Sequence, residues 1–178
     1  MFDLVLEGGT IYDGTGADPY LGDVGIKDGH ITEIGNLCGA ATNERLMIDG
    51  LAVAPGFIDL HTHSDFTLLA DGRAQSQVNQ GVTTEVIGQC GFSCAPVTCD
   101  SDIEEAGPGY LKCGVQLGWR SFDDYLKRLE ATALGVNVVA CVGHGAIHRA
   151  VLGDALRAPN PEEIKTMIRI AEQSMEAG

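Results

Sequence analysis

The segment that most constrains this chain is a short apolar run that ends in two histidines one residue apart. The run covers residues 57–60, and His61 and His63 follow it. Side chains alternate between the two faces of a strand, so two histidines with this spacing point the same way. A pair of imidazoles at the end of a buried strand forms half of a divalent-metal site. The competing interpretation is two strand histidines satisfied by hydrogen bonds, but His-x-His after an apolar run is much rarer than a lone histidine.

A third candidate ligand follows a second predicted strand. Residues 82–87 are rich in β-branched side chains, which favours a strand, and Cys90 follows between Gln89 and Gly91. Glycine allows the backbone to bend sharply there and to turn the sulfur inward. A buried structural cysteine is the alternative, because free cysteines are commonly buried. Next to two histidines, however, a thiolate completes a zinc-type ligand set, and we favour that hypothesis.

These motifs resemble those of the metal-dependent amidohydrolase superfamily. The similarity rests on residues 55–63, on residues 81–91 with the sequence Gly-Gln-Cys-Gly at their end, and on residues 142–145 with a Gly-His-Gly. Residues 3–16 also look like the start of that family's chains. The cysteine indicates the N-acyl-D-amino-acid deacylases, or D-aminoacylases, since many other members use a modified lysine or a glutamate as the bridging ligand.

The resemblance implies an α/β chain that forms the N-terminal part of a (β/α)8 TIM-like barrel preceded by a small β-sandwich. Residues 1–54 are assigned to an incomplete sandwich, normally completed by the C-terminus, and residues 55–178 to the first strands and helices of an incomplete barrel. A (β/α)8 barrel takes about 250 residues. Because the chain has 178 residues, we expect it to be the N-terminal part of a longer protein.

The resemblance also implies zinc-dependent hydrolysis of the amide bond of N-acyl-D-amino acids, which releases a carboxylate and a D-amino acid. One or two Zn²⁺ ions are expected on His61, His63 and Cys90. Two further histidines and the general acid/base aspartate are expected beyond Gly178, so the chain alone is expected to be inactive. The expected partners are a small N-acyl amino acid, the rest of the barrel and, as an open question, further copies in a homo-oligomer.

Four other residues are weaker candidates for contacts around the metal or the substrate. Asp59 and Asp65 flank the histidine pair and are candidate hydrogen-bond partners of the imidazoles. His144 is a candidate substrate or site-wall residue, and a histidine that caps its loop is an equal alternative. His148 falls where the relatives carry an arginine, so Arg149 is the candidate partner for a substrate carboxylate.

Two other functions remain open at this point. A related cyclic-amide amidohydrolase, of the dihydroorotase or hydantoinase type, shares the histidine pair, although the Gly-Gln-Cys-Gly segment disfavours it. A non-catalytic, metal-free scaffold is the second alternative. A scaffold has no need for His61, His63 and Cys90 to converge.

Charge and composition exclude several classes of partner. The net charge is −14, which disfavours nucleic-acid backbones and anionic membranes. The sequence shows no apolar run near the ~20 residues of a membrane span and no signal-peptide pattern, so a cytoplasmic location is expected. The six cysteines fit no zinc ribbon, and reduced thiols are expected, with a Cys94–Cys99 pair as the minor alternative.

The order of predicted elements agrees with two different modules. Residues 1–54 consist of short strands and turns, whereas strands at 57–60, 82–87 and 136–142 alternate with helices, which favours a parallel sheet. A short helix is predicted around residues 73–79. Residues 98–120 form a long irregular excursion, either a functional loop or a surface insertion.

Two longer helices have clear start signals. Ser121 is a predicted N-cap with Asp124 three residues later, and the final helix starts at Asn160 with Pro161 in its first turn. Residues 143–149 are predicted as a loop. We expect an apolar stripe of the final helix to pack in the core, and it consists of Ile164, Met167, Ile168, Ala171 and Met175.

Overall fold

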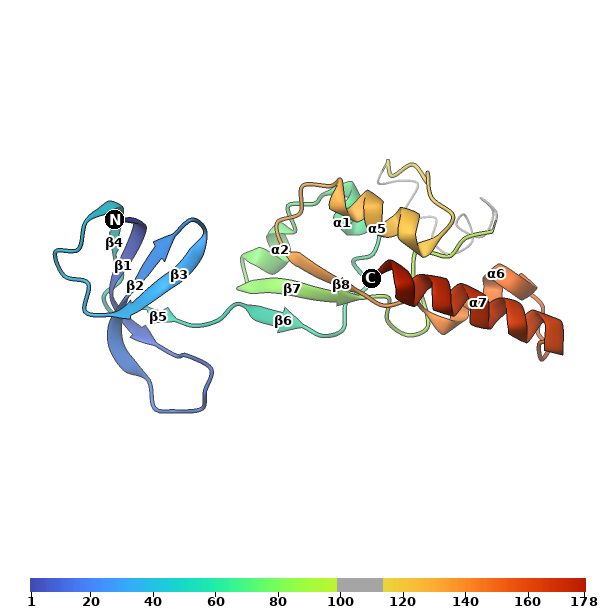
Figure 1. Ribbon diagram of the computed structural model, residues 1–178, viewed down its shortest axis with the longest axis horizontal. Helices are drawn as coiled ribbons and strands as arrows, with labels where there is room; N and C mark the ends of the chain where they lie inside the picture. Colours follow the sequence, from blue (N-terminus) through green and yellow to red (C-terminus); the bar gives the residue numbers. More distant parts are fainter. Residues whose placement is uncertain (99–113) are drawn as a thin grey trace. The chain divides into compact units, whose positions relative to one another are not determined.

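A computed structural model describes residues 1–98 and 114–178 of the chain (Figure 1). The chain divides into two compact units, Met1–Pro55 and Gly56–Gly178. Most of the excursion predicted at 98–120, and Cys99 of the minor disulfide alternative, lie outside the described residues. None of the described helices has both the length and the apolarity that a membrane crossing requires.

The first unit is built on one five-stranded sheet with the order β3-β2-β1-β4, in which β5 also pairs with β1. β1 pairs antiparallel with β2 but parallel with β4 and β5. Asp23 holds the sheet to its connections, because its two carboxylate oxygens accept hydrogen bonds from the backbone N–H groups of Gly8 and Leu37. The strands are β1 (Phe2–Ile11), β2 (Tyr20–Lys27), β3 (His30–Gly35), β4 (Thr42–Met47) and β5 (Ala52–Val53).

The second unit contains a parallel three-stranded sheet with the order β6-β7-β8. The strands are β6 (Phe57–Asp59), β7 (Val82–Ile87) and β8 (Asn137–Ala140). The predicted parallel pairing is therefore confirmed, although β8 is shorter than the strand predicted at 136–142. The prediction that the first strand is buried is wrong for the described residues, since Phe57, Ile58 and Leu60 are exposed. β6 is an edge strand of this sheet, and its only strand partner here is β7.

In the described part of this unit, two short and three longer helices accompany the sheet (Figure 1). They are α1 (Thr67–Ala70), α2 (Gln75–Val78), α5 (Phe122–Glu130), α6 (His144–Leu152) and α7 (Pro161–Ala177). The prediction of a loop at residues 143–149 is wrong, because α6 starts at His144. Its N-cap, Gly143, has no side chain to cap the helix, and Gly145 lowers helix propensity, so the usual start signals are missing.

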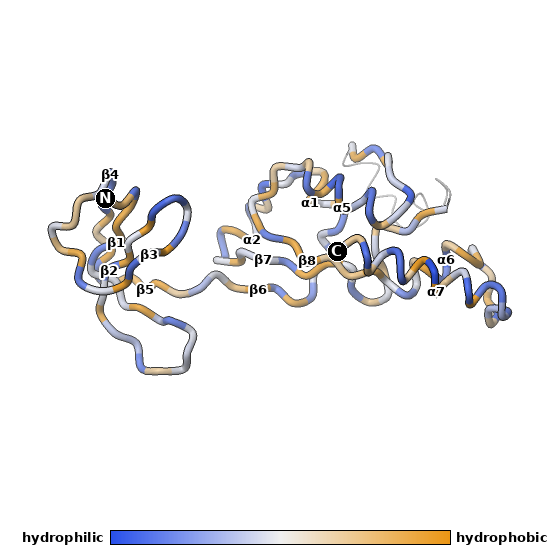
Figure 2. Tube along the Cα trace, viewed as in Figure 1, coloured by the Kyte–Doolittle hydropathy of each residue, from blue (hydrophilic) through white to orange (hydrophobic). Residues whose placement is uncertain are grey.

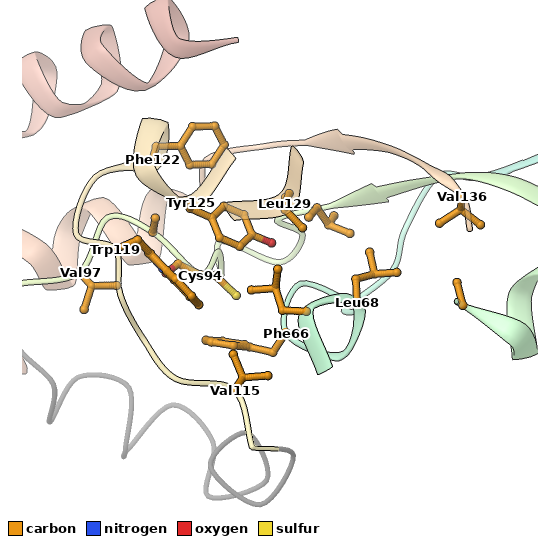
Figure 3. Close-up of a cluster of buried hydrophobic side chains, with 14 residues drawn as sticks. Phe66, Leu68, Cys94, Val97, Val115, Trp119, Phe122, Tyr125, Leu129 and Val136 are labelled. Carbon is orange, nitrogen blue, oxygen red and sulfur yellow. The ribbon is translucent and has the colours of Figure 1, made fainter. Parts of the chain in front are cut away.

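The core of the second unit lies between β7 and the layer that contains α1 and α5. Phe66, Leu68, Ile87 and Leu129 are buried in this cluster. Figure 3 shows Trp119, Phe122 and Tyr125 gathered close to Cys94. The Trp119 indole N–H donates to the Cys94 carbonyl oxygen at 2.7 Å, so the segment that precedes α5 is tied to the segment that follows β7.

The stripe assigned to the core on the final helix is only partly buried. Ile164, Ile168 and Met175 are exposed, whereas Ser174 is the buried residue of α7. Figure 2 shows hydrophobic and hydrophilic residues mixed around this helix. Successive residues of an α-helix are about 100° apart, so the half-buried Met167 and Ala171 lie on the same side of α7 as Ser174, whereas Ile164, Ile168 and Met175 lie toward its exposed side. The packed face of α7 therefore includes only part of the predicted stripe.

The predicted starts of the two longer helices are confirmed. The Ser121 hydroxyl accepts from the Asp124 N–H at 3.1 Å, and the Asp124 carboxylate accepts from the Ser121 N–H at 3.3 Å. Asn160 and Glu163 form the same reciprocal arrangement at α7. Hydrogen bonds from Arg157 and from the Asn160 N–H, with the Arg157 charge, lower the pKa of Glu163 to about 2.

Ser121→Ala is expected to lower the free energy of unfolding by about 1 kcal/mol, because the Asp124 N–H at the start of α5 loses its acceptor. Urea unfolding of the protein as its gene encodes it measures the change. Ser121→Thr is the control, since threonine keeps the capping hydroxyl. Equal losses in both variants would show that the cap is not the cause.

Candidate metal centre

The structure brings together the three residues that the sequence suggested as ligands. One donor atom each from His61, His63 and Cys90 lies within 4.8 Å of the other two, and this is the only such group of three or more among the described residues. His61 Nε2 is 3.2 Å from Cys90 Sγ. The two imidazole ring centres are 5.5 Å apart and the rings are inclined at 68°. All three side chains are exposed in this chain.

The donor set fits a borderline-soft divalent ion. Imidazole nitrogen and thiolate sulfur are the ligands that zinc favours, with bonds of about 2.0–2.3 Å. Two such donors on one tetrahedral ion lie roughly 3.5 Å apart by the same geometry. The distance of 3.2 Å between His61 Nε2 and Cys90 Sγ is close to that value, so the two side chains can share an ion with only a small adjustment.

The histidines lie just beyond the end of β6 and not within the strand. β6 ends at Asp59, yet the N–H of Thr62 still donates to the carbonyl oxygen of Val86 at 3.1 Å. The pairing with β7 is thus resumed after the strand ends. It places His61 and His63 on either side of a residue whose backbone is fixed to the neighbouring strand.

Cys90 is brought to the histidines by an unusual backbone turn. Its φ is 56°, in the left-handed region, and Gly88 and Gly91 on either side have φ values of 79° and 76°. The sequence suggested a bend that depends on glycine, but the cysteine itself also takes a conformation that L-residues rarely adopt. Strained residues of this kind cluster at functional sites.

Two side-chain contacts join this turn to the histidine segment. The Gln89 side-chain amide donates to the Leu60 carbonyl oxygen at 3.1 Å. The N–H of Gly88 donates to Asp65 Oδ1 at 3.0 Å. The cysteine turn and the histidine segment therefore form one connected piece of structure.

Asp65 is buried, and it supports the turn instead of contacting an imidazole directly. Its Oδ1 accepts from Gly88, while no hydrogen-bond partner for Oδ2 exists among the described residues. Burial raises the pKa of the Asp65 carboxyl, and hydrogen bonds from backbone N–H groups and the charge of His63 oppose that rise. Asp65 therefore lies close enough to His63 for an electrostatic interaction between the two side chains.

The other weak candidates are placed differently. Asp59 accepts from the backbone N–H of His61 at 3.1 Å, so it contacts the main chain and not the ring. His144 is the exposed first residue of α6 and pairs with the ring of His148, 6.4 Å between centres. Arg149 lies in α6 with its Nε 3.9 Å from Asp154. Neither His144 nor Arg149 belongs to the group of three ligand candidates.

Sequence analysis missed Glu85 and Ser64. Glu85 lies in the middle of β7 with no exposed surface, and one of its carboxylate oxygens accepts a hydrogen bond from the Ser64 hydroxyl. An ionisable residue inside an otherwise apolar, β-branched strand was the available signal, because such groups are rarely buried without a partner.

The described cysteines other than Cys90 offer no second thiolate at this site. Cys38, Cys90, Cys94 and Cys141 are all free thiols. Burial, and then the negative charge of Asp65, raises the pKa of Cys94 far above its ordinary value, so this thiol stays protonated. The prediction of reduced thiols is confirmed for these four residues.

Comparison with known proteins identifies the family. The profile described as "Amidohydrolase family" matches residues 48–177. The chain belongs to the amidohydrolase family. The matched region contains the whole candidate metal centre and the parallel sheet that carries it.

Several relatives are similar to this amidohydrolase chain over nearly all of its length. It is 40% identical to a D-aminoacylase of Alcaligenes xylosoxydans xylosoxydans, over 99% of this chain and 36% of that protein. It is 35% identical to an N-acyl-D-aspartate deacylase of the same organism, over 99% of this chain and 35% of the relative. The chain thus spans about a third of the length of the relatives it matches.

Solved structures agree with these sequence relatives. A crystal structure of D-aminoacylase superposes with a TM-score of 0.88 at 36% identity, covering 100% of this chain and 37% of that one. An N-acyl-D-glutamate deacylase from Bordetella bronchiseptica, in complex with zinc and a phosphonate inhibitor, gives 0.87 at 32% identity, over 98% of this chain and 36% of that one. The chain therefore has the amidohydrolase fold in its mixed α/β form over the part described.

Replacing the thiol is expected to weaken metal binding strongly. Cys90→Ser should lower zinc affinity by about 100-fold or more, since loss of even an outer contact to a ligand costs 10- to 100-fold. Competition with a chelator on the protein as its gene encodes it measures the affinity. Cys38→Ser, an exposed cysteine in the other unit, is the control. Unchanged zinc binding in Cys90→Ser would remove this residue from the ligand set.

Gly88 and Gly91 offer a matched pair for testing the cysteine turn. A Cβ at Gly88 would collide with the carbonyl oxygen of Cys141, whereas one at Gly91 would meet Gly145 N at an ordinary 3.5 Å. Both residues have positive φ, so Gly91→Ala should cost only about 1–2 kcal/mol of conformational strain. Gly88→Ala should cost more and also reduce zinc content. Equal effects in urea unfolding and in metal analysis would contradict the collision.

Proposed function

We propose that this chain supplies the first metal ligands of an N-acyl-D-amino-acid deacylase, which hydrolyses the amide bond to a carboxylate and a D-amino acid. The observation that carries the proposal is the convergence of His61, His63 and Cys90. Identity to D-aminoacylase and to two N-acyl-D-amino-acid deacylases, over 99% of this chain in each case, supports the substrate class.

The metal is proposed to be zinc, as one or two ions. Zinc is named in the complex of the N-acyl-D-glutamate deacylase, and the nitrogen and sulfur donors of this chain suit it. When bound, such an ion polarises an amide carbonyl and lowers the pKa of a water molecule to about 7. His61 and His63 would present neutral imidazoles, and Cys90 would bind as a thiolate, which neutralises part of the ion's charge.

The remaining parts of the chain act by positioning and access. Gln89 and Asp65 hold the cysteine turn against the histidine segment, so the donors are set before a ligand arrives. The exposure of all three donors leaves one side of the centre open to an acyl group. We further propose that the general acid/base aspartate and two more histidines belong to a part of the protein outside these 178 residues.

The same proposal extends to the fold. The β6-β7-β8 sheet with its helices corresponds to the beginning of a (β/α)8 barrel, in which ligands gather at the carboxyl ends of the strands. All three donors lie after the ends of β6 and β7, as that architecture requires. The five-stranded sheet of residues 1–55 is proposed to be one half of a β-sandwich.

A cyclic-amide substrate is the second candidate. The chain is 37% identical to a D-hydantoinase of Rhizobium radiobacter, but over only 49% of its length. Because of this similarity, ring amides are included in the substrate panel. The deacylases match over twice as much of the chain, and we place linear N-acyl amino acids first.

A substrate panel on the protein as its gene encodes it tests the function. N-acetyl-D-amino acids with apolar, acidic and basic side chains are compared with their L-isomers and with hydantoins, and the released amine is measured. We expect hydrolysis of a D-isomer, its loss after chelation, and its return with zinc. Turnover of hydantoins alone would favour the cyclic-amide activity. A protein that takes up no zinc when zinc is supplied, and that hydrolyses none of the compounds, would favour a scaffold.

A further inference from the structure

A chain of hydroxyl groups connects the histidine segment with the interior of β7. The Thr62 and Ser64 hydroxyl oxygens are 2.8 Å apart, and the Ser64 hydroxyl donates to Glu85 Oε2. A hydroxyl has one proton to donate. The hydroxyl proton of Ser64 is directed to Glu85, so the hydroxyl oxygen of Ser64 accepts from Thr62. The chain of hydrogen bonds therefore runs from Thr62 through Ser64 to Glu85.

Alternation along the backbone explains why these residues meet. His61 and His63 point to the side of Cys90, whereas Thr62 and Ser64 lie between and after them on the other side of the segment. The face of β7 that carries Glu85 also carries Ile87, which is buried in the core. The two hydroxyls therefore point toward the face of β7 that carries Glu85 and Ile87, whereas the two imidazoles point toward Cys90.

Glu85 is an unusual residue for its position. Its side chain has no exposed surface, and no hydrogen-bond partner for Oε1 exists among the described residues. Burying a carboxyl group with one oxygen unpartnered opposes folding, and an apolar residue would fill the same place without that cost. What Glu85 provides in return is an acceptor for the hydroxyl of Ser64, the residue directly after His63.

We propose that Glu85 is a positioning residue of the metal centre. Through Ser64 and Thr62 it fixes the backbone between the two histidines, so that both imidazoles are directed at the ion that they share with Cys90. This inference rests on the proposed metal-dependent function. It assigns to Glu85 no contact with the substrate and no proton transfer.

The test compares Glu85→Leu, Ser64→Ala and the conservative Glu85→Gln in the protein as its gene encodes it. The first two remove the acceptor or the donor, and we expect zinc affinity to fall by about 10- to 100-fold. The absorption spectrum of the cobalt-substituted protein should change as well, because it reports the arrangement of nitrogen and sulfur around the ion. Glu85→Gln keeps a side-chain oxygen for Ser64 and should stay close to the wild type in both measurements.

Leu129→Ala is the control for a general loss of stability. Leu129 is buried in the core from α5 and is not a member of the hydroxyl chain. This variant should unfold at a lower temperature and still bind zinc and cobalt as the wild type does. Ser64→Ala removes a single oxygen. If this variant behaves like Leu129→Ala, with a lower unfolding temperature but unchanged zinc affinity and cobalt spectrum, then Glu85 is merely structural and the inference is wrong.

The same experiment separates this inference from the proposed function. A wild type that binds no metal at His61, His63 and Cys90 overturns both. A wild type that binds zinc through these residues but hydrolyses no N-acyl-D-amino acid overturns the substrate assignment alone. In that case the zinc affinity and the cobalt spectrum of the Glu85 and Ser64 variants still test whether Glu85 positions the metal ligands.

Discussion

The parallel pairing of β6 with β7 is the interaction on which the candidate metal centre depends. Parallel strands end at the same edge of a sheet, so the residues that follow β6 and β7 are brought together although they are far apart in sequence. The pairing is resumed at Thr62, beyond the end of β6. A shift of one residue in this register would turn His61 and His63 away from Cys90 and bring Thr62 and Ser64 into their place.

This pairing is reinforced from side chains as well as from the main chain. Gln89 reaches back to Leu60, Asp65 holds Gly88, and Ser64 contacts Glu85. Each bond joins the histidine segment to β7 or to the cysteine turn. A site assembled from two strands is thereby restricted to one relative position, which preorganises donors that would otherwise move with two exposed loops.

Much of this arrangement could be predicted because it follows from local patterns. The strand at 82–87, the helix start at Ser121 and the helix start at Asn160 depend on neighbouring residues and were found from them. The three ligand candidates were found for a similar reason, since each lies within three residues of the end of an apolar, strand-like run. The start of α6 at Gly143 lacks a capping side chain, so no local pattern marked that helix.

Features that depend on distant contacts could not be predicted in this way. Which part of the apolar stripe of α7 is buried depends on what lies against the helix in space, and the exposure of β6 depends on its place at the edge of the described sheet. The role of Glu85 requires knowledge that Ser64 lies against it. The left-handed backbone of Cys90 is equally invisible in a sequence, because cysteine is not a residue that usually takes it.

The exposure of Cys90 has a consequence for experiments that remove metal from this protein. An ion on the sulfur shields it from oxidants, and chelation leaves an accessible thiol 3.2 Å from an imidazole nitrogen. Accessible thiols are open to oxidants, and past the sulfenic acid the damage is irreversible. A loss of zinc binding that added zinc fails to reverse would then report oxidation of the thiol and not the affinity of the protein for the ion. A reductant belongs in every buffer used for removing and restoring the metal.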